Sequence, residues 1–163
     1  MTQTSPLRIA IFPGSFDPFT VGHQQVVEQA LTLFDRIIIA IGQSSSKNAL
    51  LSSEERLAAL RETFAAEPRV EAAAFSGLVV TYAQARGANF LLRGLRNETD
   101  LAYEMPMAHT NACLAPGIHT VFFPTAPEKA FVSSTLVREI ARCQGDFRQF
   151  VPAAFARRML GVK

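Results

Sequence analysis

Apolar residues in this chain form two patterns, short continuous runs and stretches with helical spacing. The clearest run is Arg36 to Gly42, apolar at every position between its ends, as in a strand buried on both faces. Helical spacing is seen between Val26 and Phe34, and Ser52 with Glu55 forms a capping box that predicts a helix through about Phe64. Further strands are predicted at 8–12, 70–75, 89–93 and 120–123, and further helices at 78–85, 99–114, 136–142 and, interrupted by Pro152, 147–160.

Strands and helices therefore alternate along the whole chain. Such alternation predicts right-handed crossovers and a parallel sheet covered by helices on both faces. The length of 163 residues fits one domain. We predict an α/β fold in which residues 1–163 form a single Rossmann-like domain, a doubly wound sheet of five parallel strands. Ligands of such sheets bind beyond the carboxyl ends of the strands, where most of the unusual polar segments fall.

Composition narrows the class of protein. The formal net charge is only +2, which argues against a nucleic-acid partner. No apolar run is long enough to span a membrane and the N-terminus lacks a signal-peptide pattern, so we expect no membrane partner and a cytoplasmic protein. Cys113 and Cys143 are expected to be reduced, partly buried thiols. His109 and His119 match no motif and are expected at packing or surface positions.

The first motif runs from Phe12 to His23, after a predicted strand and into a predicted helix. Gly14 allows a tight turn, and Ser15 offers an N–H and a hydroxyl to an anion. Gly22 and His23 begin the helix, whose free N–H groups favour phosphate. The Gly-His pair alone would indicate a glycine turn followed by a solvated histidine. The whole run, with a predicted strand before it and a predicted helix after it, favours a phosphate site. It is neither a Walker A loop nor a GxGxxG fingerprint.

Three further segments lie at or after the ends of predicted strands. Leu92 to Arg96 contains two arginines, which suit bidentate phosphate contacts, although two surface arginines are the alternative. Phe131 to Glu139 contains consecutive hydroxyl residues at a helix start, where capping and phosphate binding are about equally expected. Lys47 follows a serine-rich loop and could reach the same cleft as a mobile cation.

Four carboxylates lie near these motifs in the sequence. Asp17 is expected to hold the first loop through local hydrogen bonds. We expect Glu104 to contact a nucleotide, and we assign Asp100 and Glu139 structural roles.

Together the motifs resemble the bacterial phosphopantetheine adenylyltransferases of the nucleotidyltransferase superfamily. The superfamily signature T/H-x-G-H is present as Thr20-Val21-Gly22-His23. The family resemblance rests on four further segments and extends from about Arg8 to the tail. These segments are 13–18 (PGSFDP), 92–96 (LRGLR), 102–105 (AYEM) and 133–139 (SSTLVRE). Phe12 and Val21 stand where Tyr and Asn are frequent, and Pro106 stands where Gln is frequent, which predicts a kink after Glu104.

The resemblance implies adenylyl transfer from ATP to 4′-phosphopantetheine, with Mg²⁺ as cofactor and without a metal site made by the protein. It also implies a homo-oligomer, typically a hexamer, with coenzyme A as a possible feedback ligand. His23 and Lys47 are the implied catalytic residues, and phosphopantetheine would contact Ser15, Lys47, Val79 and Arg93. ATP would contact Ser15, Phe16, His23, Gly94, Leu95, Arg96, Glu104, Lys129, Ala130, Phe131, Val132, Ser133, Ser134 and Thr135.

Phosphopantetheine would supply its own anionic nucleophile, so positioning and charge stabilisation would carry catalysis. One alternative is a related nucleotidyltransferase acting on nicotinamide mononucleotide or glycerol 3-phosphate. Another is a non-catalytic ATP-binding α/β module, which would not require His23.

Overall fold

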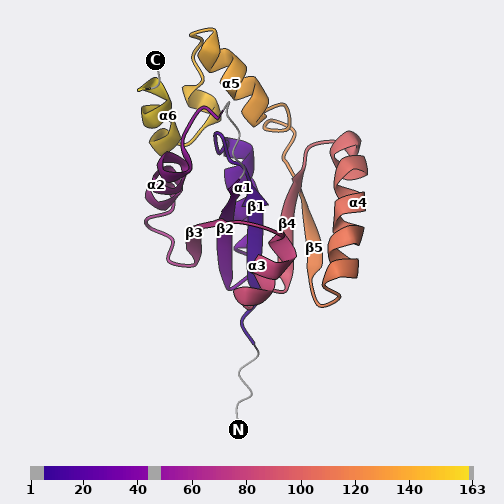
Figure 1. Cartoon of the computed structure of the whole chain (residues 1–163). Coiled ribbons are helices and arrows are strands. Elements are labelled where there is room, and N and C mark those ends of the chain that lie inside the picture. Colours follow the sequence, from indigo (N-terminus) through magenta and orange to yellow (C-terminus); the bar gives the residue numbers. More distant parts are fainter. Residues whose placement is uncertain (1–5, 44–48, 162–163) are drawn as a thin grey trace.

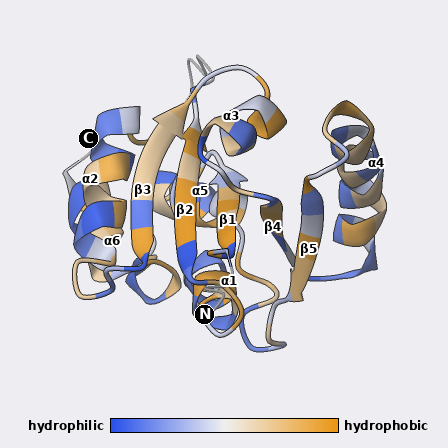
Figure 2. Cartoon of the chain, turned by 90° about the horizontal axis from the view of Figure 1, so that it is seen from below, coloured by the Kyte–Doolittle hydropathy of each residue, from blue (hydrophilic) through white to orange (hydrophobic). Residues whose placement is uncertain are grey.

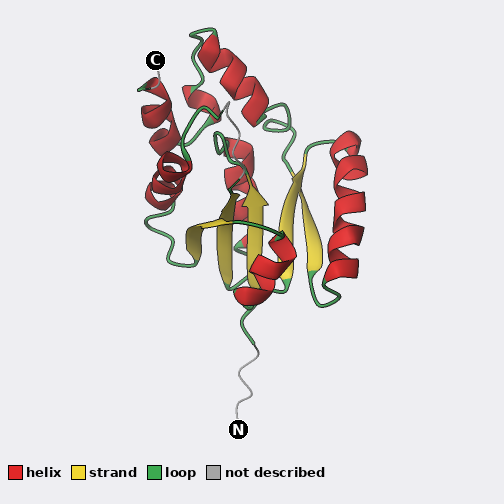
Figure 3. Cartoon of the chain, viewed as in Figure 1, coloured by secondary structure: helices red, strands yellow, loops and turns green. Residues whose placement is uncertain are grey.

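The computed structural model describes residues 6–43 and 49–161, so Lys47 lies outside the described residues. The elements follow the predicted order (Figure 3). They are β1 (Ile9–Gly14), α1 (Val21–Ala30), β2 (Arg36–Gly42), α2 (Ser53–Thr63), β3 (Val70–Phe75), α3 (Val79–Ala85), β4 (Phe90–Leu95), α4 (Glu98–Leu114), β5 (His119–Pro124), α5 (Ser134–Arg142), the 3₁₀ helix η1 (Arg148–Phe150) and α6 (Ala153–Leu160).

The five strands form one parallel sheet in the order β3-β2-β1-β4-β5. The chain winds outward from β1 to β3 and then returns to the other side of β1 through α3, so the sheet is doubly wound (Figure 1). Helix α4 lies beside β4 and β5, and α5 lies above the carboxyl ends of the strands (Figure 1). This confirms the predicted fold class.

Strand β2 shows why the sheet is covered on both faces. Successive side chains of a strand point to opposite faces. Ile37, Ile39 and Ile41 pack in the cluster that includes α1 and α2, whereas Ile38 and Ala40 pack in the cluster that includes α3. Both faces of β2 are therefore buried, which accounts for its continuous apolar sequence (Figure 2).

The sheet opens between β1 and β4. Strand β1 pairs with β2 along its whole length, but it pairs with β4 only at Ala10 and Ile11. The crossovers also change face between these two strands, as they do at the ligand crevice of doubly wound sheets. The carboxyl ends of β1 and β4 therefore border an opening.

Two local features differ from the sequence predictions. Strand β4 extends to Leu95, two residues beyond its predicted end at Arg93. Cys113 and Cys143 are free, as predicted, but both are exposed rather than partly buried. His109 and His119 are also exposed, as expected. Helix α4 includes Pro106 within its span, and the kink after Glu104 stays a prediction. Within the described residues, no helix combines the length and the apolarity that a membrane span needs.

Candidate active site

A cavity of about 320 Å³ lies at the opening between β1 and β4. Four segments that are distant in sequence contribute to its wall: the loop after β1 with the start of α1, the end of β4 with the first turns of α4, Thr125 just after β5, and the start of α5. Of the residues implied by the family resemblance, the cavity brings together Ser15, Phe16, His23, Arg93, Gly94, Arg96, Glu104, Val132, Ser133, Ser134 and Thr135.

Other implied residues do not line this cavity. Val79 begins α3 and packs beside the core on that face of the sheet. Lys129 and Phe131 line a neighbouring hollow of about 320 Å³, which shares Val132 with the first. Leu95 and Ala130 line neither of these two cavities. The predicted role of Lys47 falls outside the described residues.

Gly14 is the last residue of β1, where the chain enters the loop that lines the cavity. A Cβ atom on Gly14 would lie 2.7 Å from the Phe16 ring, too close for any side chain. Phe16 itself has a φ of 49°, in the left-handed region that non-glycine residues rarely adopt. Its buried ring packs edge-on against His23 with 5.2 Å between ring centroids. The strained backbone of Phe16 thus places an aromatic wall beside the histidine.

Thr20 fixes both the position and the tautomer of His23. Thr20 caps α1 in a capping box, in which its backbone N–H donates to His23 Nδ1 at 3.0 Å. Because an N–H donor faces Nδ1, that nitrogen must be the unprotonated one. The ring proton therefore sits on Nε2, so His23 can offer a phosphate oxygen an N–H donor.

The surroundings of His23 keep its imidazole neutral. Burial among phenylalanine rings, followed by the charges of Arg96 and Arg93, lowers the pKa of His23 from 6.5 to about 4. Phe19, at 5.3 Å between ring centroids, completes the apolar wall together with Phe16. At neutral pH His23 is thus an uncharged donor beside two permanent cations.

Two helix N-termini meet at the cavity. Helix α1 contributes Gly22 and His23, and α5 contributes Ser134 and Thr135 behind its cap Ser133. The first N–H groups of a helix have no intrahelical acceptors, and the helix dipole favours anions there. The cavity therefore offers backbone donors from two sides in addition to its arginines.

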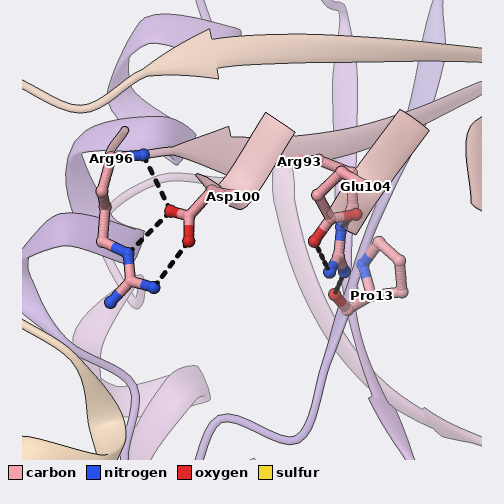
Figure 4. A network of polar contacts seen from close by, with 5 residues as sticks. All are labelled: Pro13, Arg93, Arg96, Asp100 and Glu104. Atoms are coloured by element: carbon pink, nitrogen blue, oxygen red, sulfur yellow. Dashed lines mark hydrogen bonds and ion pairs between the residues drawn. The ribbon is translucent and has the colours of Figure 1, made fainter. Parts of the chain in front are cut away.

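Arg93 crosses the opening between β4 and β1. Its Nη1 donates to the carbonyl of Pro13 at 2.9 Å, and its Nε donates to Glu104 at 2.7 Å (Figure 4). Nη2 donates to the second oxygen of the same carboxylate, so Glu104 is held bidentately. Both Glu104 oxygens are thus engaged by Arg93, whereas the resemblance implies that Glu104 contacts ATP.

Arg96 forms a similar pair with Asp100 (Figure 4). Its Nε and Nη2 donate to the two oxygens at 2.8 and 2.9 Å, and its backbone N–H donates to the same carboxylate. The hydrogen bond from the Arg96 side chain is the main reason why the pKa of Asp100 is lowered. Asp100, expected to be structural, therefore contacts a cavity arginine directly.

Asp17 holds the first loop through long-range contacts, whereas local ones were predicted. Its buried carboxylate accepts from the N–H groups of Leu50 and Leu51 at 2.7 and 2.9 Å. Arg56, also buried, donates to the carbonyl of Ser15. The start of α2 and the segment before it are therefore tied to the loop that lines the cavity.

The described side chains do not form a cage for a metal ion. The two carboxylates that line the cavity, Asp100 and Glu104, already pair with arginines. No group of three or more His, Cys, Asp or Glu within residues 6–43 and 49–161 could hold an ion. Mg²⁺ commonly binds through substrate phosphates and keeps several waters. The residues present thus do not fit a protein-held Mg²⁺, whereas a nucleotide could bring the ion on its own phosphates.

Sequence reasoning missed three members of the cavity, which are Val26, Asp100 and Thr125. Asp100 could have been recognised from its spacing, because it lies four residues after Arg96 and four before Glu104, and α4 is helical there. Thr125 lines the cavity beyond β5, and no motif of the chain includes it.

Comparison with known proteins identifies the class. The cytidylyltransferase-like family matches residues 11–140. The fold resembles that of a putative nicotinate-nucleotide adenylyltransferase from Vibrio parahaemolyticus, with a TM-score of 0.69 and 16% identity over 95% of this chain and 99% of that chain. The parallel sheet, the cavity and the family match together define a nucleotidyltransferase of the cytidylyltransferase-like class.

Closer relatives specify the family. A phosphopantetheine adenylyltransferase from Bradyrhizobium sp. is 48% identical, covering 91% of this chain and 94% of the relative. One from Acidovorax sp. is 43% identical, covering 93% and 92%. Another from Flavobacterium johnsoniae is 45% identical, covering 91% and 97%. The chain therefore belongs to the phosphopantetheine adenylyltransferase family, and the resemblance noted in the sequence is confirmed.

Proposed function

We propose that this protein transfers the adenylyl group of ATP to the phosphate of 4′-phosphopantetheine, giving dephospho-coenzyme A and pyrophosphate. Relatives that align over nearly the whole chain carry the name of this activity. The observation that carries the proposal is the convergence of His23, Arg93 and Arg96 on one cavity with two helix N-termini. Such a site suits two polyanionic substrates.

The reaction needs no protein nucleophile. A phosphate oxygen of phosphopantetheine forms a bond to the α-phosphorus of ATP while the bond to the bridging oxygen breaks, and pyrophosphate leaves with the electron pair. Nε2–H of His23 donates to the α-phosphate as charge moves onto its oxygens. Arg93 holds the acceptor phosphate, and Arg96 with Ser133 to Thr135 holds the β- and γ-phosphates. Lys47 remains a predicted additional cation.

Mg²⁺ is the proposed cofactor, and it would bind through the phosphates of ATP. Because Asp100 and Glu104 are paired with arginines, the protein supplies the cavity with guanidinium and N–H donors rather than with metal ligands. The ion would add charge neutralisation at the triphosphate. Residues of this chain would orient the complex of the ion with ATP.

A homo-oligomer, by resemblance a hexamer, is the proposed assembly. Of the side chains of α4, only Glu104 is buried, while Leu101, Tyr103 and Leu114 are exposed. A helix with so many exposed apolar residues suits an interface between copies. Coenzyme A is the proposed feedback ligand, because it would carry the same pantetheine group as the acceptor. The proposed location is the cytoplasm, where free thiols such as Cys113 and Cys143 stay reduced.

An acceptor screen tests the proposed function. Purified protein with ATP and Mg²⁺ is given 4′-phosphopantetheine, nicotinamide mononucleotide or glycerol 3-phosphate, and pyrophosphate release is measured. We expect release only with phosphopantetheine. Release with another acceptor would assign a different nucleotidyltransferase activity, and release with none would favour a non-catalytic ATP-binding module.

A further inference from the structure

Two carboxylates of α4 face the two arginines of the cavity. Asp100 and Glu104 lie four residues apart, so they share one face of the helix on successive turns. Each binds its arginine through both carboxylate oxygens (Figure 4). We propose that Asp100 and Glu104 are positioning residues, which hold the guanidinium groups in the orientation that aligns the reacting phosphates. This inference rests on the proposed function.

Arg93 is the more fully constrained of the two arginines. Its Nε and Nη2 donate to Glu104, and its Nη1 donates to the carbonyl of Pro13. A guanidinium has five N–H groups, so two remain for a ligand. Contacts to α4 on one side and to the end of β1 on the other fix its plane before any ligand arrives. Little rotamer entropy is then lost when phosphate binds.

Arg96 is held more loosely. Its Nε and Nη2 donate to Asp100, which leaves three N–H groups for a ligand. The side chains of this pair are 36% and 20% exposed, compared with 27% and 10% for Arg93 and Glu104. Water weakens exposed ion pairs. Loss of the Glu104 contacts should therefore have the larger effect.

A purely neutralising role and an orienting role of the two carboxylates predict opposite effects of their removal. If the carboxylates only neutralise the arginines, their removal leaves more positive charge in the cavity and should tighten the binding of anionic substrates. If they orient the arginines, their removal should slow the reaction even where substrates still bind, because in-line attack depends on alignment. Tighter substrate binding would therefore indicate a neutralising role, whereas a slower reaction would indicate an orienting role.

The test compares Glu104→Gln and Asp100→Asn with the control Glu98→Gln, using pyrophosphate release to obtain kcat and both KM values. Glu98 lies in the first turn of α4 and is exposed, so the control makes the same charge change without touching an arginine of the cavity. For Glu104→Gln we expect kcat to fall about tenfold or more, with the KM for phosphopantetheine within about threefold. Asp100→Asn should lower kcat less, and Glu98→Gln should stay within about twofold of wild type.

Two further variants exclude a merely structural effect. Glu104→Asp keeps the charge but shortens the reach, so kcat should again fall. In an Arg93→Ala background, Glu104→Gln should cause little further loss, because Glu104 acts through Arg93. Thermal unfolding of each variant monitors folding, and if Glu104→Gln alone does not fold, the Glu104→Asp variant decides the question.

Three outcomes would overturn the inference. Unchanged kcat with a lower KM in Glu104→Gln would show a purely neutralising role. A higher KM for ATP alone would show a direct ATP contact, and fully additive losses with Arg93→Ala would show independent roles. Wild-type protein that releases no pyrophosphate with phosphopantetheine would instead refute the proposed function.

Discussion

His23 enters the cavity as a neutral donor because two features of its surroundings act together. The backbone N–H of Thr20 donates to Nδ1 of His23, and a wall of phenylalanine rings disfavours the protonated, charged imidazole. Arg93 and Arg96 lower its pKa further. Since the ring is already neutral, it can donate through Nε2 throughout the physiological pH range.

Removal of this donor should affect turnover much more than folding. We expect His23→Ala to fold normally and to lose on the order of 10²–10³ in kcat, as when one oxyanion donor is removed. ATP binding should change less, because Arg96 and the start of α5 still hold the triphosphate. Pyrophosphate release and ATP titration calorimetry measure the two effects. A wild-type rate in the variant would contradict the assigned role of His23.

The lowered pKa of His23 also predicts a pH dependence of stability. The unfolded ring has a pKa of 6.5 and the folded one about 4, so between these values only the unfolded state binds the proton. The contribution of His23 to the free energy of unfolding is therefore fully present above pH 6.5, and it is lost as the pH falls toward 4. Between pH 7 and 5, wild type should lose about 1–2 kcal/mol more unfolding free energy than His23→Gln. Urea unfolding at both pH values checks this, and equal losses in the two proteins would contradict it.

At the scale of elements, the loop after β1 is the point where distant segments meet. Asp17 accepts from the segment before α2, and Arg138 and Ser134 of α5 donate to the carbonyls of Asp17 and Pro18. The loop that lines the cavity is therefore positioned by both α2 and α5. Rigid support of this kind keeps donors in place when charge develops on a substrate.

Asp17→Asn should test this connection. An amide offers one oxygen where the carboxylate offers two, so one buried N–H of Leu50 or Leu51 would lose its acceptor. We expect a loss of about 1–3 kcal/mol in unfolding free energy, measured by urea denaturation. The control Asp35→Asn removes an exposed carboxylate that accepts from one backbone N–H, that of Arg8, and should cost less. Equal losses in the two variants would argue against a special role for Asp17.

At the scale of the whole molecule, α4 has a different role on each of its sides. One side supplies Asp100 and Glu104 to the cavity arginines. The remainder exposes apolar side chains, among them Leu101 and Tyr103, the latter 71% exposed. If copies of the chain associate through α4, assembly and the active site would share one helix.

Tyr103→Glu should therefore disturb the assembly. A charge on the exposed apolar surface of α4 would be costly to bury between copies. We expect light scattering after size exclusion to show an oligomer for wild type and smaller species for the variant. Leu33→Glu, another exposed apolar position outside α4, should keep the wild-type size. A monomeric wild type at micromolar concentration would contradict the proposed homo-oligomer.

Much of the fold could be predicted because its signals are local. The apolar run of β2 and the capping box of Ser52 and Glu55 each depend on residues close in sequence. The cavity members His23 and Arg93 could be placed together because parallel strands end at one edge. The left-handed backbone of Phe16 had no comparable signal, because non-glycine residues rarely adopt this region and phenylalanine carries no preference for it.

By itself, the sequence determined the order of strands and helices, the edge of the sheet that carries the chemistry and the family of the chain. Only the tertiary structure decided which carboxylate pairs with which arginine, that Asp17 reaches Leu50 and Leu51, and that His23 stays neutral. The physical reason is range: propensity and periodicity act between neighbours along the chain. Ion pairing and desolvation depend on groups that approach one another only after the chain has folded.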